Sequence, residues 1–263
     1  MKSYLAFTRG SFMVGLVYRF GFLFAIVGNA IYMGVAYYLW RSIYHNTITL
    51  HGLTFNETFL YIGLGSGVFI LLKTYTDWFV HYEIRDGAIA SYLIKPIDYQ
   101  LYVLFSSLGA LITNALATTI PTVLILIFIF KIKIIMGWGL VFFPISLLLA
   151  FLISFSLDYF IGIMGFYTES VWGIVTTKEI LLSILSGALI PLQFFPIIFQ
   201  KILLVLPFQA IFYTPLMMVT KPDQDIKSLL LSLGIQLFWA ITLFIATRLF
   251  YNQAVKVLRI GGG

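Results

Sequence analysis

The chain has 263 residues, of which 61% are hydrophobic and 10% are charged, and its mean hydropathy is +1.01. A soluble domain needs more polar surface to cover its core, so this composition excludes an ordinary soluble protein and indicates an integral membrane protein. The formal charge of +6 does not indicate nucleic-acid binding, because the basic residues are scattered between apolar runs, and the lack of cysteine excludes disulfides and thiolate metal sites.

The first element in chain order, residues 1–19, is predicted to be an uncleaved interfacial helix. Its basic residues, Lys2, Arg9 and Arg19, are spread among aromatic and aliphatic residues instead of preceding a compact apolar core, so the segment does not resemble a cleavable signal peptide. A bilayer core about 30 Å thick then needs roughly 20 apolar residues per crossing helix. The predicted transmembrane helices are 20–40, 59–79, 101–130, 140–166, 180–194 and 229–251.

The region between residues 180 and 219 is apolar but is interrupted by Pro191, Pro196, Pro207 and Pro215. Each proline removes a backbone donor and clashes with the preceding helical turn, so one straight helix is not expected. Backbone that is not helical at membrane depth must be covered by protein or face water. We therefore expect the fifth span to end near residue 194 and residues 195–219 to form a re-entrant or interfacial helical hairpin before the sixth span.

Six spans place both termini on one side of the membrane. With the N-terminus inside, nine basic residues, Arg85 and Lys95 among them, lie in or beside cytoplasmic segments and six lie on the opposite side, a moderate bias that predicts cytoplasmic termini. Residues 82–98 and 167–179 are then cytoplasmic loops, the second with a solvated face or a second partner contact at Glu169, Lys178 and Glu179. The predicted fold class is all-α: one polytopic membrane domain over residues 1–263 with six transmembrane helices.

The segment 82–96, YEIRDGAIASYLIKP, is a polar interruption between two apolar spans. It can form about three helical turns with Ile84, Ala88 and Tyr92 on one face, and the residue before Pro96 is pushed out of the helical region. A short amphipathic cytoplasmic helix suits a groove on a soluble protein. The alternative is an ordinary loop that lies on the lipid headgroups.

The chain carries no nucleotide-binding loop. Gly10 and Gly15 have the spacing of a phosphate-binding loop, but Leu16 and Val17 stand where Lys and Ser or Thr are required, so any ATP hydrolysis belongs to a partner. A metal site is not expected either, because no metal-binding spacing relates the histidines, His45, His51 and His81.

Polar and charged residues inside the predicted spans are further candidates, because a buried charge there is costly. Asp158 either faces the translocation path or a subunit interface, or makes a hydrogen-bonded helix contact. Lys73 and Asp77 stand one helical turn apart and are predicted to pair with each other, and Asn114 is predicted to hydrogen-bond across helices.

Two long motifs resemble a known family. GAIASYLIKPIDYQLYVL at 87–104 resembles the stretch after the second span of type-2 ATP-binding-cassette (ABC) export permeases. LSGALIPLQFFPIIFQKILLVLPFQAIFYTP at 185–215 is similar to that family's region around the fifth span and re-entrant hairpin, and the C-terminal VLRIGGG fits the way some members end. Together these motifs follow the family's order over essentially the whole chain.

The resemblance implies a permease subunit of an ATP-driven exporter in the plasma (inner) membrane, not an enzyme. It implies a second permease subunit, identical or sister, and a cytoplasmic ATPase dimer that binds ATP and Mg, with no cofactor in this chain and no nucleic acid. Segment 82–98 would be the coupling element on the ATPase, through Glu83, Ile84, Arg85, Asp86, Ile89, Lys95 and Pro96. Candidates for the translocation path or the subunit interface are Asp158, Asn114, Pro191, Phe195 and Pro196.

Two other classes of function are alternatives. An intramembrane enzyme could use Asp77 and Asp158 as paired carboxylates, but their positions in the predicted spans place them at different depths. A secondary carrier driven by an ion gradient would normally show related halves or paired broken helices, whereas the proline-broken region occurs once. The sequence leaves the cargo open among drug-like amphiphiles, lipids, peptides and glycan precursors.

Overall fold

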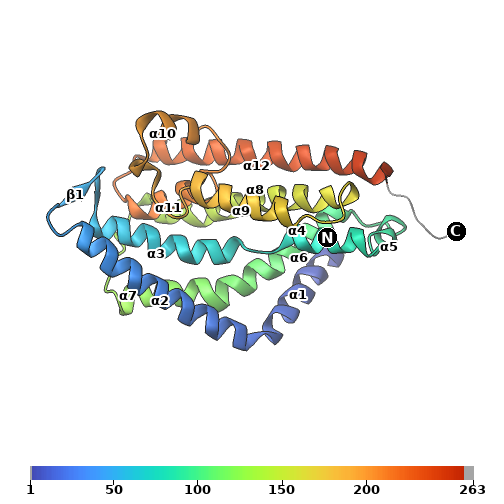
Figure 1. The fold of residues 1–263 in the computed structure, drawn as a ribbon, viewed down its shortest axis with the longest axis horizontal. Coiled ribbons are helices and arrows are strands. Elements are labelled where there is room, and N and C mark those ends of the chain that lie inside the picture. Colours follow the sequence, from blue (N-terminus) through green and yellow to red (C-terminus); the bar gives the residue numbers. More distant parts are fainter. Residues whose placement is uncertain (1, 258–263) are drawn as a thin grey trace.

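The computed structural model describes residues 2–257, and these form a bundle of helices along one long axis (Figure 1). Five helical stretches are long and apolar enough to cross a membrane: Phe20–Ile43, Phe55–Arg85, Tyr99–Phe128, Trp138–Phe166 and Ile226–Val257. They correspond to five of the six predicted spans. The chain is therefore a predominantly helical, multi-pass membrane protein.

The helices that make up these crossings are α2 (Arg19–Ile43), α3 (Phe55–Leu72) with α4 (Thr76–Arg85), α6 (Tyr99–Asn114) with α7 (Ile120–Phe128), α8 (Trp138–Ile163) and α12 (Ile226–Ala254). A π-helical turn, η1 (Ala115–Thr119), joins α6 to α7, and the 3-10 turns η2 (Met164–Phe166) and η4 (Val255–Val257) follow α8 and α12. The strands β1 (Thr49–Leu50) and β2 (Leu53–Thr54) form a two-stranded antiparallel hairpin before α3.

The first helix, α1 (Lys2–Val17), packs along α6. The Thr8 hydroxyl donates a hydrogen bond to the Phe105 carbonyl at 2.7 Å. Gly109 permits this approach, because a Cβ atom there would lie 2.4 Å from the Thr8 carbonyl oxygen. The helix is thus anchored to the bundle, and its place at the membrane interface stays a prediction.

The second crossing is broken between α3 and α4, where Tyr75 adopts a left-handed conformation with φ of 54°. Asn114 of α6 compensates for the break. Its side-chain amide donates to the carbonyls of Ile70 and Lys73, at 3.0 and 3.2 Å. The predicted cross-helix hydrogen bonding of Asn114 is therefore confirmed. It supplies a donor to the Lys73 carbonyl at the end of α3 and a second donor to the Ile70 carbonyl, which also accepts from the Lys73 N–H at 3.3 Å.

The predicted boundaries of the fifth span are wrong. The helix in this region, α9, runs over Trp172–Leu185 and ends before the first proline, where Gly187 has a φ of +78°. The prolines instead lie beside or near the starts of short helices: Pro191 precedes η3 (Leu192–Phe194), Pro196 precedes α10 (Ile197–Leu203), and Pro215 is in the first turn of α11 (Tyr213–Thr220). Proline is tolerated at a helix start because the backbone N–H groups of the first turn have no intrahelical acceptor, so the N–H that proline lacks is not missed.

The chain returns to the end of α9 after these short elements. The Tyr213 backbone N–H, at the start of α11, donates to the Ser186 carbonyl at 3.1 Å. α11 then packs on α3 and α8, and its residues Tyr213–Thr220 are almost all buried. The helices α9 and α11 therefore meet end to end, with residues 187–212 as an excursion between them.

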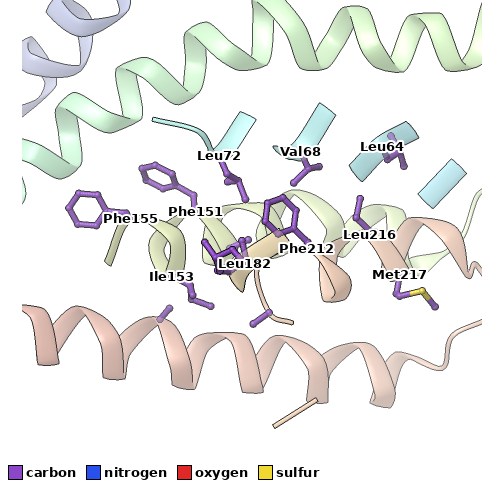
Figure 2. Packing of buried hydrophobic residues seen from close by; sticks show 14 of the residues in the cluster. Leu64, Val68, Leu72, Phe151, Ile153, Phe155, Leu182, Phe212, Leu216 and Met217 are labelled. Carbon is purple, nitrogen blue, oxygen red and sulfur yellow. The ribbon is translucent and has the colours of Figure 1, made fainter. Parts of the chain in front are cut away.

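The core lies around α3. Leu64, Val68 and Leu72 follow one another at four-residue spacing on α3 and point toward side chains of α8, α9 and α11 (Figure 2). In the most apolar window of the second crossing, 67% of the residues are buried, against 17% for the crossings formed by α2 and α12. The outer faces of α2 and α12 are consequently apolar surfaces that suit lipid or another subunit.

The elements sort to two ends of the bundle. The start of α1, the end of α12 and the short helix α5 (Ala90–Leu93) lie toward one end, while β1 and α10 lie at the other (Figure 1). The C-terminal motif from residue 258 onward lies outside the described residues. The predicted coupling segment is thus at the same end of the bundle as the start of α1 and the end of α12.

Candidate functional site

The predicted three-turn helix over residues 82–96 is wrong. The helix α4 ends at Arg85, Gly87 turns the chain with a φ of +73°, and only Ala90–Leu93 form a further helical turn, α5. Glycine adopts this positive φ without steric cost, so it ends the helix where the apolar spacing alone would continue it. The coupling segment, residues 82–98, is therefore a helix end followed by a compact turn.

The turn divides the predicted coupling residues into two sets. Ile84 and Ile89 are buried, with 7% and 0% exposure, and Glu83 also turns inward. Exposed residues lie on the outer side, among them Arg85, Asp86, Lys95 and Pro96, and Ile94 is 85% exposed. Only this outer set is available to a partner.

The inner side of the turn is held by a cluster of tyrosines around Glu83. Its carboxylate accepts hydrogen bonds from the Tyr99 and Tyr102 hydroxyls, at 2.7 and 3.2 Å. The Tyr92 hydroxyl donates to the Tyr102 hydroxyl at 2.9 Å, and the two rings stack at 4.5 Å. Burial raises the pKa of Tyr92 above its ordinary value, which keeps the hydroxyl a donor. These contacts tie α4, α5 and α6 together.

A second connection joins the same end of α6 to α12. Asp98 caps α6 by accepting from the Leu101 N–H at 3.0 Å, and both of its oxygens accept from the Arg248 guanidinium, one at 2.6 Å. Although partial burial favours the neutral acid, the hydrogen bonds from Arg248 and Leu101 hold the pKa of Asp98 below its ordinary value. Tyr99, the next residue, stacks on Tyr251 of α12 at 5.6 Å.

Sequence reasoning missed this Asp98–Arg248 pair. A signal for half of it was present, because an Asp just before an apolar helical run is a strong N-cap residue. The partner lies 150 residues away and is found only from the packing of α6 against α12.

A buried ionic cluster lies near the break in the second crossing. The Lys178 ammonium of α9 donates to Asp77 of α4 at 2.6 Å and to Asp158 of α8 at 2.7 Å. The three side chains are 13%, 3% and 8% exposed. Three helices therefore meet at one lysine and two carboxylates, an arrangement that is strongly destabilised if one partner is lost.

This cluster corrects three expectations. The predicted Lys73–Asp77 pair is wrong, because Lys73 pairs with Glu179 at 3.3 Å. Lys178 and Glu179 do not lie in a solvated loop, because α9 begins at Trp172. The two aspartates lie close together instead of apart along the helices, but the Lys178 ammonium bridges their oxygens, so they do not face each other as the carboxylates of an acid–base pair do.

The remaining predicted site residues do not join this cluster. Pro191 is buried beside η3, whereas Pro196 is exposed at the start of α10, near the end of the bundle opposite α5 (Figure 1). The Phe195 carbonyl between them accepts from the Gln200 side chain at 2.7 Å. The structure thus separates the segment 191–196 from Asp158.

Comparison with known proteins identifies the family. The family model of the ABC-2 family transporter proteins matches residues 30–262. This range begins within α2 and includes the four later crossings in full. No match to the chain was found among curated proteins. The family match agrees with the resemblance carried by the motifs at 87–104 and 185–215. The chain belongs to the ABC-2 family of transporter proteins, as a membrane permease component of an ABC transporter.

Proposed function

We propose that this chain is the permease subunit of an ATP-driven exporter and that a separate cytoplasmic ATPase docks on the outer side of residues 85–96. The observation that carries the proposal is the exposed turn itself. It presents Arg85, Leu93, Ile94 and Lys95 beyond the end of the bundle, although the rest of the segment is packed inward. An apolar residue with flanking charges on a stiff turn suits a groove on a soluble protein.

Contacts behind the turn would carry a push from the ATPase into the bundle. Tyr92 and Glu83 connect the turn to α4 and α6, and Asp98 and Tyr99 connect the start of α6 to α12. Tyr99 also lies against Tyr159 of α8, with ring centroids 6.3 Å apart. Four crossings thus share one set of contacts, so movement of the turn would tilt them as rigid bodies.

The wider assembly follows from the same proposal. The apolar outer faces of α2 and α12 would contact lipid or a second permease subunit, identical or sister. The ATPase dimer would bind ATP and Mg. Both termini and residues 82–98 would face the cytoplasm of a cell bounded by a plasma (inner) membrane, as the distribution of basic residues predicts. Residues 187–212, the excursion between α9 and α11, would form the re-entrant or interfacial hairpin of the opposite side, and α1 an interfacial helix against α6.

Co-purification of the ATPase tests this proposal. Ile94→Asp together with Leu93→Asp places charge on the exposed side of the turn and should lower the amount of ATPase recovered with the permease by about 10-fold or more. Ile48→Asp is the matched control, because Ile48 is 89% exposed beside β1 at the other end of the bundle. Equal recovery with both variants would contradict docking at this turn.

A further inference from the structure

A small cavity of about 50 Å³ opens at the buried ionic cluster. Its charged wall is formed by Asp77, Asp158 and Lys178, with Lys73 and Glu179 at the exposed mouth. By the same measure of volume, one water molecule needs about 10–15 Å³, so the cavity can hold a few waters or one ammonium group.

The charges around this cavity do not balance. Three carboxylates stand against two lysine ammonium groups in it. Asp158 is 8% exposed, its Oδ1 accepts from Lys178, and its Oδ2 has no hydrogen-bond partner among residues 2–257. This oxygen is not fully enclosed by protein, so it is available to accept from a cation or another hydrogen-bond donor in the cavity.

A second, apolar cavity of about 270 Å³ lies next to the first and shares Phe69 with it as a lining residue. Phe69 borders both, and the larger cavity continues between α2, α3 and α9, past Tyr32, Ile70 and Leu189. Its size is near the lower limit of ligand pockets, about 300 Å³. Tyr32 and Leu189 are 42% and 53% exposed, so this cavity is open to the surface that faces lipid in a membrane.

The ring of Phe69 is positioned for a cation as well as for an apolar group. The Lys73 ammonium already lies 5.8 Å from its centroid, within the range of cation–π contacts. Phe69 also stacks on Phe212, with ring centroids 6.0 Å apart. A molecule that passes Phe69 therefore meets aromatic carbon first and the free Asp158 oxygen beyond it.

We propose that these two cavities form one binding site for a cationic amphiphile, with a protonated amine at Asp158 and its apolar body between α2, α3 and α9. The inference rests on the proposed transport function, because it names the class of cargo that the permease accepts. An ammonium group supplies both the missing positive charge and N–H donors for Asp158 Oδ2. A neutral or anionic amphiphile of the same length supplies neither.

Binding of decylamine to the permease alone, in lipid nanodiscs without any ATPase, tests the site. Radiolabelled decylamine should bind saturably above empty nanodiscs, and unlabelled decylamine should displace it, whereas decanol and decanoate at equal concentration should not. Displacement by decanol as effective as that by decylamine would overturn the proposal, because it would show a site without charge recognition.

Two variants locate the site on the structure. Asp158→Asn keeps the shape of the side chain and leaves the Asp77–Lys178 pair in place, and it should weaken decylamine binding by about 10-fold or more. Asp223→Asn, an exposed carboxylate in another part of the chain, should bind as the wild type does. Unchanged binding by Asp158→Asn would overturn the proposal.

Phe69→Leu covers the case in which Asp158→Asn does not fold. It keeps apolar volume but removes the ring, and it should weaken binding several-fold while the Asp158 cluster stays intact; unchanged binding would overturn the shared role of Phe69. The outcome is separable from the coupling proposal, because ATPase recovery is measured on a different surface. If decylamine binds but the ATPase does not dock at the turn, the binding-site proposal stands and the coupling proposal fails. If the ATPase docks at the turn but decylamine does not bind, the coupling proposal stands and the binding-site proposal fails.

Discussion

Removal of the Lys178 ammonium should be among the most destabilising single changes in this protein. Lys178→Met keeps an unbranched apolar stem but leaves Asp77 and Asp158, 3% and 8% exposed, with no cation between them. Breaking a buried pair by loss of one partner costs about 3–5 kcal/mol, because the remaining charge is buried and unpaired. Here two carboxylates lose the same partner, so we expect a cost in the upper part of that range.

The matched control is Lys73→Met. Lys73 and its partner Glu179 are 33% and 42% exposed, and such pairs contribute about 0–1 kcal/mol. At about 2–4 °C per kcal/mol for a chain of this size, Lys178→Met should lower the melting temperature by about 8–20 °C and Lys73→Met by a few degrees at most. Intrinsic tryptophan fluorescence of the purified protein during heating measures both.

A rescue distinguishes charge from packing. When Asp77→Asn and Asp158→Asn are added to Lys178→Met, no uncompensated charge remains, and most of the lost stability should return. Equal melting temperatures for Lys178→Met and Lys73→Met would refute the reasoning, and so would a triple variant that is no more stable than Lys178→Met.

Three further changes test the other contacts. Asn114→Ala removes the side-chain donor of the Ile70 and Lys73 carbonyls. The Ile70 carbonyl keeps the bond from the Lys73 N–H, but the Lys73 carbonyl loses its donor, and the free energy of unfolding should fall by about 1–3 kcal/mol in a denaturant titration; a change within about 0.5 kcal/mol, that of a neutral surface substitution, would contradict the capping role. Asp98→Asn should destabilise the protein at pH 7, and because the pKa of Asp98 is lowered in the folded state, the difference from wild type should be lost as the pH falls below 3.8; a difference that is the same at pH 7 and pH 3 would argue against the ion pair with Arg248. Gly109→Ala would place a Cβ atom 2.4 Å from the Thr8 carbonyl and should separate α1 from α6, which faster proteolysis of α1 would report; an unchanged rate would show that α1 does not depend on this approach.

The apolar crossings could be predicted from the sequence because length and hydropathy are local properties. The runs 20–40 and 229–251 lie within the helices Phe20–Ile43 and Ile226–Val257. The predicted second span ends at residue 79, before the end of α4 (Thr76–Arg85), because charged and polar residues interrupt the apolar run there. Their stabilising partners lie on other helices, which no hydropathy window detects.

The ionic cluster shows the same limitation more clearly. Lys178 and Glu179 look like loop residues because they stand in a polar stretch, and this moved the predicted start of the fifth span to residue 180. Their partners Asp77 and Lys73 lie about a hundred residues earlier, 101 residues in the case of Asp77 and Lys178. Only the packing of α9 against α4 and α8 brings these charges together.

The position of the coupling segment could be predicted from the sequence, but its conformation could not. Its polarity between two apolar runs correctly marked a segment at the end of the bundle. The helical spacing of Ile84, Ala88 and Tyr92 predicts one continuous helix, but Gly87 lies within this stretch and turns the chain with a positive φ. The same turn buries Ile84 and Ile89, which therefore support the segment from within.

The most direct test of the account is labelling of the exposed turn in intact cells. The chain has no cysteine, so Ile94→Cys supplies a single thiol at an 85% exposed position. A membrane-impermeant maleimide should leave it unlabelled in intact cells, label it in inside-out vesicles, and label it less when the ATPase is present. Labelling of Ile94→Cys from outside intact cells, or labelling in vesicles that the ATPase does not reduce, would contradict the claim that this turn receives the ATPase.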